Sequence, residues 1–354
     1  MVTPQHANVV GVGLIGGSVA RALRARGWHV SGLDDDAARL AQASDLDVID
    51  AQGIDPDAEL TVIATPVGAV AEAAAKALAA TRGIVTDVGS VKGTIVGEVD
   101  DPRFIGGHPM AGSERDGVEG ADGDLFSGAV WVLTPTATTD DTAYTRLRSI
   151  ITSLGAEVLA LDPHRHDEFV AVVSHVPHLT AASLMRMAGD RADEHAALLR
   201  LAAGGFRDMT RIASGAPDIW PDICAENRDA IVDGIDRLIG ALGDARDQVA
   251  GGDRDGLFRT LTAARTARHN LPSRYTTPEN LAEFRVAVDD RPGVLAEVTT
   301  LAGELDVNIV DLEIRHSTEG DQGVLILVVE ANEADGFLPG LQARGYRPAV
   351  RRLA

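Results

Sequence analysis

The chain has 354 residues, 45% of them hydrophobic, so it can bury a substantial core, and its length favours two or three domains. Its formal net charge of -21 would repel a nucleic-acid backbone or an anionic membrane surface, which excludes both as partners. The single cysteine, Cys224, excludes an internal disulfide framework. No apolar run approaches the roughly 20 residues of a membrane span, and the first residues lack a basic segment followed by an apolar one. These features predict a cytoplasmic protein.

The first part of the sequence alternates short β-like runs with alanine-rich helical stretches. Helices are expected at 18–26 and 67–80, and strands at 8–13, 29–34, 60–66, 83–90, 103–109 and 128–135. Strands that alternate with helices form a parallel sheet with helices on both faces. Residues 1–163 are therefore predicted to form a doubly wound α/β domain of the Rossmann type.

Two further regions differ in pattern from the first. Residues 164–275 contain long helical segments, among them 219–249 and 253–269, without a convincing strand, which predicts an all-helical domain. Pro, Ser and Thr replace Ala and Leu at 270–280, as in a linker. From 281 to 354, strands and helices follow in the order β-α-β-β-α-β, which predicts a ferredoxin-like α+β domain.

A glycine-rich turn follows the first expected strand and opens directly into a helix. Gly11, Gly13 and Gly16 have dinucleotide-binding spacing: the first permits the turn, the second lets a pyrophosphate approach, and the third brings helix and strand together. Asp34 ends the second strand, where a carboxylate hydrogen-bonds ribose hydroxyls and repels a 2′-phosphate, so NAD is favoured over NADP. The alternative is a glycine turn without a ligand. The expected cofactor contacts are Gly11, Gly13, Leu14, Ile15, Gly16, Asp34, Thr65, Pro66 and Asp87.

A single histidine stands in the stretch GGHPMAGSE, at the end of the fifth expected strand. His108 should lie in the same crevice as the nucleotide, where an imidazole beside a hydride acceptor can take the proton of a substrate hydroxyl. The glycine pair and the proline around it fix the backbone, which favours this role over that of a surface-loop histidine. At the neighbouring strand ends, Thr65 and Ser90 are equally compatible with plain turn or helix-capping residues.

Taken in order, the stretches GLIGGS, DVGSVKG, GGHPMAGSE, SHVPH, DMTRIA and PDIWPDICAEN resemble the prephenate dehydrogenases of tyrosine biosynthesis over essentially the whole chain. Residues 282–354, with DDRPGVLAEVTTLAGELDVNI, resemble an ACT domain, a small amino-acid-sensing module. The resemblance implies an NAD(P)-dependent oxidative decarboxylation of prephenate, in which a hydride leaves C4, the ring carboxylate leaves as CO2 and 4-hydroxyphenylpyruvate forms. Aromatisation supplies the driving force.

The resemblance also implies roles for individual residues. His108 is the group bonded to the C4 hydroxyl, with Ser90 beside it, so these two are the expected catalytic residues. Arg211 is the candidate clamp for a substrate carboxylate, since its planar fork matches that group. Glu114 would repel a dianionic substrate, which favours a gating or positioning role, or else a solvated loop position. The implied substrate-binding residues are Ser113, Glu114, His175, His178, Arg211 and Trp220.

Four histidines lie close together in HRHDEFVAVVSHVPH, which raises the question of a metal site. His175 and His178 share a helix face, but Pro177 interrupts that helix and no cysteine or carboxylate completes a closed ligand set, so no metal is expected. His178 is the stronger candidate for a carboxylate contact, whereas His175 and Trp220 are equally compatible with packing in the core.

The helical and C-terminal regions carry the expected partners. Apolar residues recur at helical spacing at 231, 235, 238, 239 and 242, which fits either the homodimer that the family resemblance implies or an internal core. The stretch DRPGV exposes backbone amides at a helix N-terminus, a natural seat for the carboxylate of an amino acid. The implied effector is tyrosine or phenylalanine, and the alternative is a domain used for dimerisation alone. The expected effector contacts are Pro292, Gly293, Val294 and Asn308.

Three other functions fit parts of the sequence. Arogenate dehydrogenases perform the same chemistry on a substrate with an amino group in place of the side-chain keto group, and no motif separates the two. Hydroxyisobutyrate-type dehydrogenases combine similar domains but use a lysine on the helical domain, and this chain has no lysine beyond residue 150. A non-enzymatic sensor of NAD and an amino acid would leave His108, His178 and Arg211 without a role.

Overall fold

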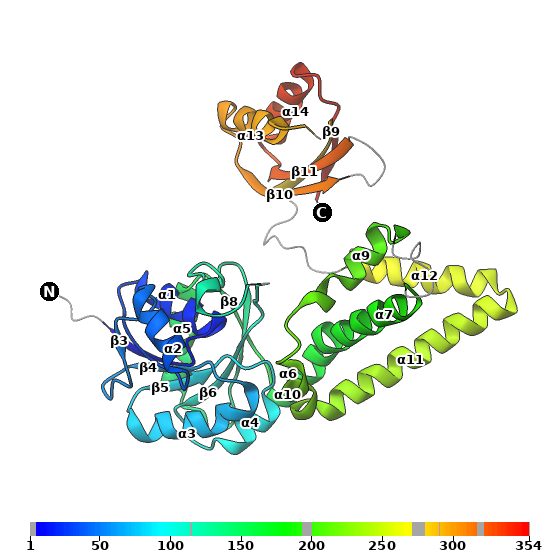
Figure 1. The fold of residues 1–354 in the computed structure, drawn as a ribbon. Coiled ribbons are helices and arrows are strands. Elements are labelled where there is room, and N and C mark those ends of the chain that lie inside the picture. Colours follow the sequence, from blue (N-terminus) through cyan, green and yellow to red (C-terminus); the bar gives the residue numbers. More distant parts are fainter. Residues whose placement is uncertain are drawn as a thin grey trace. The chain divides into compact units, whose positions relative to one another are not determined.

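A computed structural model gives the fold of the chain (Figure 1). It describes residues 5–113, 115–192, 200–270, 280–289, 291–316 and 322–353. The chain divides into two compact units, Met1–Arg200 with Asp208–Gly243 and Leu201–Arg207 with Asp244–Ala354. Within the part of the chain that the structure describes, no helix is both long enough and apolar enough to cross a membrane.

The first unit is built on an eight-stranded sheet in the order β3-β2-β1-β4-β5-β6-β7-β8. Its strands are β1 His6–Val10, β2 His29–Leu33, β3 Ala51–Gln52, β4 Leu60–Ile63, β5 Ile84–Asp87, β6 Phe104–Pro109, β7 Val130–Thr134 and β8 Glu157–Ala160. The strands β1 to β6 pair in parallel, which confirms the doubly wound arrangement. β7 departs from it by running antiparallel to β6, and β8 pairs in parallel with β7. The sequence pattern does not predict β3, which is too short, or β8, which is mostly exposed.

Helices cover both faces of this sheet (Figure 1). The helices α1 (Leu14–Arg24), α2 (Ala37–Asp45) and α5 (Asp141–Ser153) pack on one face, and α3 (Val70–Ala80) and α4 (Gly93–Glu98) on the other. All four residues of β4 and of β5 are buried, as expected for strands covered on both sides. Because these strands are parallel, the polar residues that follow β1, β4, β5 and β6 meet at one edge of the sheet.

The helical part of the first unit begins with α6 (Pro163–Val170), which continues through a π-helical turn at Ala171–His175 into α7 (Val176–Ala192). The π-helical turn directly precedes Pro177. A proline lacks an N–H, and the widened turn lets the N–H of Val176 bond the carbonyl of Ala171. Further along the chain lie α9 (Gly204–Thr210) and a 3-10 turn at Arg211–Ser214.

The single helix expected at 219–249 is two helices, α10 (Trp220–Glu226) and α11 (Arg228–Gly251), with Asn227 between them. Asn227 has φ -112° and ψ 33°, outside the helical region. Its side chain is buried and donates a hydrogen bond to the carbonyl oxygen of Asp167 at 2.9 Å. The helix is therefore interrupted where an amide finds a tertiary partner, which a local sequence pattern cannot reveal.

The second unit contains α12 (Arg254–His269) and a C-terminal α+β domain. The elements of that domain are β9 Leu281–Asp289, α13 Val294–Glu304, β10 Ile309–His316, β11 Gln322–Glu330, α14 Ala334–Ala343 and β12 Ala349–Arg352. Their antiparallel sheet has the order β10-β11-β9-β12, and Phe284 of β9 packs edge-on against Phe337 of α14 in the core. The predicted ferredoxin-like order is confirmed. Most of the expected linker, residues 271–279, lies outside the described residues.

Candidate active site

The glycine turn that joins β1 to α1 has the geometry its spacing predicts. Gly11 has φ +91°, a conformation that favours glycine. A Cβ at Gly16 would overlap the carbonyl oxygen of Gly11, so only glycine lets the helix approach the strand this closely. At Gly13, by contrast, a Cβ would meet no atom within 4 Å, so space is free beside the backbone. The turn is therefore shaped to admit a group close to its backbone.

Two features at these strand ends fit a dinucleotide. The helix α1 begins with Leu14 and Ile15, and no side chain caps it, which leaves backbone N–H groups available to an anion. Thr65 and Pro66 follow β4, and the Oγ1 of Thr65 is buried without a hydrogen-bond partner among the described residues. An uncapped helix terminus and an unpaired hydroxyl at adjacent strand ends are suited to the pyrophosphate and ribose of a dinucleotide.

Asp34 follows the end of β2, but its carboxylate already has partners within the protein. Its Oδ2 accepts a hydrogen bond from the N–H of Val12 at 2.9 Å, and its Oδ1 accepts one from the N–H of Asp36 at 2.9 Å. Arg39, in the first turn of α2, forms an ion pair with Asp34 at 3.2 Å. A cation therefore stands at the strand tip, where the sequence pattern predicts only a carboxylate. Arg39 is not among the predicted cofactor contacts.

Asp87, which the sequence predicts as a cofactor contact, is an internal residue instead. Its side chain is completely buried and forms an ion pair with Lys92, which is also completely buried. The two carboxylate oxygens further accept hydrogen bonds from the N–H of Gly89 at 2.8 Å and the N–H of Gly107 at 3.0 Å. Asp87 thus holds the ends of β5 and β6 together and presents no oxygen to a cofactor.

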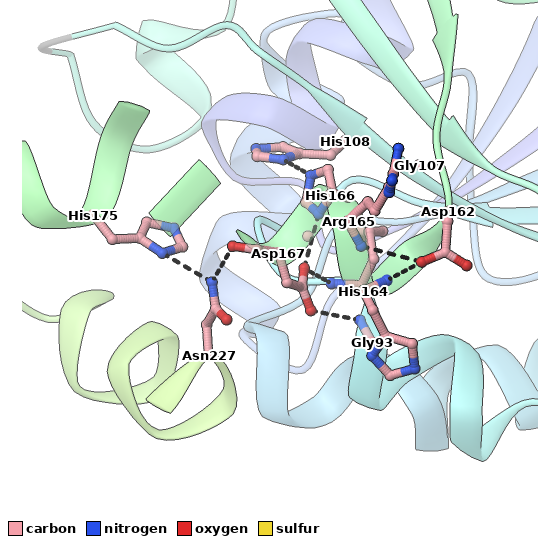
Figure 2. Close-up of polar contacts among 12 residues, drawn as sticks. Gly93, Gly107, His108, Asp162, His164, Arg165, His166, Asp167, His175 and Asn227 are labelled. Atoms are coloured by element: carbon pink, nitrogen blue, oxygen red, sulfur yellow. Dashed lines mark hydrogen bonds and ion pairs between the residues drawn. The ribbon is translucent and has the colours of Figure 1, made fainter. Parts of the chain in front are cut away.

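His108, near the end of β6, meets a second histidine that comes from α6 (Figure 2). Its Nδ1 lies 2.8 Å from Nε2 of His166. The Nδ1 of His166 lies in turn 2.8 Å from Oδ1 of Asp167. His166 is completely buried and Asp167 is buried, whereas His108 is half-buried and so keeps an accessible part. The three side chains form one hydrogen-bonded series, and neither His166 nor Asp167 is among the site residues predicted from the sequence.

Asp167 anchors this series to several elements. Its Oδ1 accepts a hydrogen bond from the N–H of Lys92 at 2.8 Å, and its Oδ2 accepts one from the N–H of Gly93 at 2.7 Å. Its carbonyl oxygen accepts the side-chain N–H of Asn227, whose Nδ2 also lies 3.3 Å from Nδ1 of His175 (Figure 2). One polar network therefore joins the sheet edge to α6, the π-helical turn and the junction of α10 with α11.

Burial lowers the pKa of three histidines in this region. The pKa of His108 lies well below the ordinary 6.5, because burial disfavours a charged ring and because the positive charge of Lys92 lies nearby. Burial lowers the pKa of His175 to about 4, and it also lowers the pKa of His178. His108 is therefore neutral near pH 7, which is the state a general base needs.

Three of the predicted substrate residues come together between α7 and α10. The ring of His178 stacks on Trp220, with centroids 3.7 Å apart and planes inclined by 15°. His175 meets the same indole edge-on, with centroids 6.1 Å apart. Arg211 is exposed and begins the 3-10 turn that packs along α7. Since Asn227 links His175 to Asp167, this group adjoins the network that ends at His108.

The two serines predicted for the site are not brought to His108 by hydrogen bonds. Ser90 is half-buried in the turn after β5 and forms no hydrogen bond with His108 within the described residues. Ser113 is exposed, and its hydroxyl accepts a hydrogen bond from the N–H of Arg115 at 3.1 Å. Glu114 lies outside the described residues. Among the residues that the structure describes, no three His, Cys, Asp or Glu side chains gather in a way that could hold a metal ion.

The predicted effector residues lie at the start of α13. Gly293 has φ +94° and follows Pro292, which confirms the tight turn expected before Val294. No side chain caps the helix at this turn. Asn308 is exposed just before β10, and its backbone N–H donates a hydrogen bond to Glu333 at 3.0 Å. The turn and Asn308 are thus both accessible to a ligand.

A Rossmann-type sheet with an uncapped glycine turn after β1, together with a half-buried histidine near the end of β6 at the same edge of the sheet, is the arrangement of a nucleotide-dependent dehydrogenase. Three family models match the chain: the nucleotide-binding domain of prephenate dehydrogenase at 19–160, its dimerization domain at 162–263, and the ACT domain at 283–343. The chain belongs to the prephenate dehydrogenase family.

Individual relatives span most of the chain. The prephenate dehydrogenase of Bacillus subtilis (strain 168) is 34% identical over 342 residues, which cover 92% of this chain and 92% of that protein. The cyclohexadienyl dehydrogenase of Zymomonas mobilis subsp. mobilis is 33% identical and covers 76% of this chain and 96% of that protein. A solved structure, prephenate dehydrogenase from A. aeolicus in complex with hydroxyphenyl propionate and NAD+, matches with a TM-score of 0.71 and 30% identity, covering 77% of this chain and 99% of that chain. The protein is therefore an oxidoreductase, which sets aside the sensor. Its family membership sets aside the hydroxyisobutyrate-type alternative.

Proposed function

We propose that the protein catalyses the NAD-dependent oxidative decarboxylation of prephenate to 4-hydroxyphenylpyruvate in L-tyrosine biosynthesis. The observation that carries this proposal is the position of His108, half-buried near the end of β6 in the nucleotide-binding sheet, where burial lowers its pKa. The complex of the A. aeolicus relative with NAD+ supports the choice of cofactor.

His108 is the general base for the C4 hydroxyl. Its Nδ1 is engaged with His166, so Nε2 is the nitrogen that takes the proton. Removal of that proton favours departure of the hydride as C4 becomes a carbonyl carbon, and NAD, when bound, supplies the hydride acceptor. Loss of CO2 then returns an electron pair to the ring, the C4 oxygen recovers the proton from His108, and the aromatic ring forms. His108 therefore ends the cycle neutral, and no external acid or base is consumed.

The two carboxylates of prephenate need different contacts from the protein, because one stays in the product and the other leaves as CO2. Arg211 would clamp the side-chain carboxylate through its planar guanidinium. His178, whose pKa burial lowers and whose ring is held flat against Trp220, would offer a carboxylate a hydrogen bond rather than a full charge. Such a neutral donor suits a carboxylate that must leave, because a strong ion pair would stabilise the ground state more than the transition state.

Ser90 would lie beside His108, and Ser113 with Glu114 would lie at the entrance of the substrate pocket.

Four groups at the ends of β1, β2 and β4 would hold NAD. The uncapped start of α1 would receive the pyrophosphate, and the buried hydroxyl of Thr65 would gain the hydrogen-bond partner it lacks within the described chain. Gly13 leaves room for the close approach. Asp34 would bond the adenosine ribose, which requires Arg39 to move aside. The negative charge of Asp34 would repel the 2′-phosphate of NADP, whereas the positive charge of Arg39 would attract it. The preference for NAD over NADP therefore depends on which of the two side chains dominates.

The helical domain would form a homodimer. In the single chain, Ile231 is buried at 4% exposure, but Ile239 and Leu242 on the same helix, α11, are each 60% exposed. Packing in the core of a single chain therefore accounts for Ile231, at the start of the apolar series on α11, but not for the exposed residues further along it. The family model that covers 162–263 is a dimerization domain, which supports burial of the remainder against a second copy.

The ACT domain would make the enzyme sensitive to an aromatic amino acid. Tyrosine, the product of the pathway, is the proposed effector, with phenylalanine as the second choice. Its carboxylate would bind the uncapped turn at Gly293, and its polar groups would reach Asn308.

The formation of NADH, followed by its absorbance, tests the proposal with prephenate or arogenate as substrate and NAD or NADP as cofactor. We expect the highest kcat/KM with prephenate and NAD, and 4-hydroxyphenylpyruvate as the product. A higher kcat/KM with arogenate than with prephenate would identify arogenate as the substrate of the same oxidative decarboxylation. No turnover of either substrate would refute the proposed function.

A further inference from the structure

The series Asp167–His166–His108 has a chemical direction. An ionised carboxylate only accepts hydrogen bonds, whereas a neutral imidazole donates through one nitrogen and accepts through the other. In this series each contact joins one specified atom to another, at 2.8 Å in both cases. The protonation of the first member therefore sets which nitrogen carries hydrogen in every ring that follows.

The first member is Asp167. Both of its carboxylate oxygens face backbone N–H groups, those of Lys92 and Gly93, as an ionised acceptor requires. The neighbouring Nδ1 of His166 must then donate, so hydrogen sits on that nitrogen. The Nε2 of a neutral His166 is left with a lone pair, and it accepts from Nδ1 of His108. The Nε2 of His108 is consequently free of hydrogen.

We propose that His166 and Asp167 are positioning residues that hold His108 in the tautomer with hydrogen on Nδ1. This inference rests on the proposed role of His108 as a general base. Only that tautomer presents an unprotonated Nε2 to the substrate hydroxyl. When His108 takes the proton, the same contacts bind the resulting positive charge, because its Nδ1–H still donates to His166 and the series ends on the carboxylate of Asp167.

The surroundings keep the series rigid. Gly93 accommodates it, since a Cβ there would lie 2.9 Å from Oδ2 of Asp167. The buried pair of Lys92 and Asp87 fixes the backbone on both sides, because Lys92 N–H bonds Asp167 and Asp87 accepts the N–H of Gly107, next to His108. His166 is at 0% exposure, so bulk solvent does not compete for its hydrogen bonds.

The tautomers can be measured directly in the full-length enzyme without substrate. The chain has ten histidines, so selective ¹⁵N labelling of histidine gives few signals, and His108→Asn and His166→Gln assign the two of interest. We expect each of the two rings to carry hydrogen on Nδ1 and none on Nε2. Hydrogen on Nε2 of His108, or a doubly protonated His166, would overturn the inference.

Kinetics of substituted enzymes provide the second test. In Asp167→Asn, an NH2 group faces either His166 or a backbone N–H, which disturbs the direction of the series. We expect kcat to fall by about 10²- to 10⁴-fold while KM for prephenate and Kd for NAD change by less than about threefold. Turnover within threefold of the wild type, or equal losses in binding and turnover, would contradict the positioning role.

A pair of variants at His166 separates positioning from packing. His166→Leu removes the acceptor for Nδ1 of His108, whereas His166→Gln keeps an acceptor oxygen on a side chain of similar reach. We therefore expect kcat of His166→Gln to be at least about tenfold higher than kcat of His166→Leu. Equal rates for the two variants would refute the inference. His164→Asn serves as the matched control, because His164 is an exposed histidine on the same helix and should leave kcat unchanged.

These measurements separate the inference from the proposed function. If the wild type does not oxidise prephenate but His108 shows the expected tautomer, the proposed function fails alone. If the wild type oxidises prephenate but the tautomer of His108 is reversed, the inference fails alone.

Discussion

The ammonium group of Lys92 forms an ion pair with the carboxylate of Asp87, and neither side chain is exposed to solvent. The chain has only two lysines, and the other one, Lys76, is a surface residue of α3. Asp87 also accepts the N–H of Gly107, so the pair ties the turn after β5 to the strand that carries His108. Burial lowers the pKa of Lys92, and the charge of Asp87 opposes that effect.

Replacement of Lys92 by methionine should destabilise the protein severely. Breaking one side of a buried ion pair leaves an uncompensated charge and costs about 3–5 kcal/mol. The control Lys76→Met removes an exposed pair with Glu72 and should change stability by less than about 1 kcal/mol. Urea unfolding of both variants measures the difference. Similar midpoints for the two variants would contradict the role assigned to Lys92.

Much of the fold could be predicted from the sequence, because its determinants are local. The glycine spacing at 11, 13 and 16 requires a particular turn, and the structure has that turn. The alternation of strands and helices specifies the parallel core, since period and length are properties of short segments. The antiparallel pairing of β7 with β6 is not local, and no pattern within the strand VWVLT predicts its direction.

The candidate site was less predictable, because most of its contacts join distant segments. His166 and Asp167 occur in the helical stretch HRHDEF, and only packing reveals that they face β6 and α4. Asp162 caps this helix, which fixes where it begins but not which of its faces packs against the sheet. Arg39 lies five residues beyond Asp34, in the first turn of the next helix, from which a long side chain can fold back to the strand tip.

The catalytic rate should remain independent of pH to below pH 6.5. A base must be unprotonated, so activity is lost as the pH falls through its pKa, and burial beside His166, Lys92 and His175 lowers the pKa of His108. The profile of kcat/KM should therefore have its acidic limb well below the ordinary histidine value. His108→Asn should bind NAD normally but lose roughly 100-fold or more in kcat. An acidic limb at or above pH 6.5, or unchanged turnover in this variant, would remove His108 from the chemistry.

Arg211→Ala should act mainly on the affinity for substrate. A carboxylate clamp stabilises the ground state and the transition state alike, so KM for prephenate should rise by the equivalent of roughly 2 to 4 kcal/mol. The control Arg186→Ala removes an arginine that is 85% exposed on α7, and its KM should match the wild type. If Kd for NAD rose instead while KM for prephenate stayed the same, Arg211 would belong to the cofactor side.

Asp34→Ala should relax the preference for NAD. The substitution removes the repulsion of a 2′-phosphate and also releases Arg39, which can then pair with that phosphate. We expect kcat/KM with NADP to rise by about tenfold or more, and the double variant Asp34→Ala with Arg39→Ala to lose most of that gain. Steady-state rates with each cofactor test both steps. A wild-type enzyme that already prefers NADP would show that Arg39, rather than Asp34, dominates the strand tip.

Tyrosine should inhibit the full chain through the ACT domain. An effector changes activity only if it binds the less active state more tightly, by typically 1–3 kcal/mol. The turn at Gly293 is left-handed, uncapped and exposed, so it can receive a carboxylate, and Asn308 is exposed just before β10. Asn308→Ala should therefore weaken inhibition by about tenfold or more without changing kcat, and a chain ending near Thr277 should stay active with most of the inhibition gone. If the shortened chain were inhibited as strongly as the full chain, tyrosine would be competing at the active site, where it resembles the product.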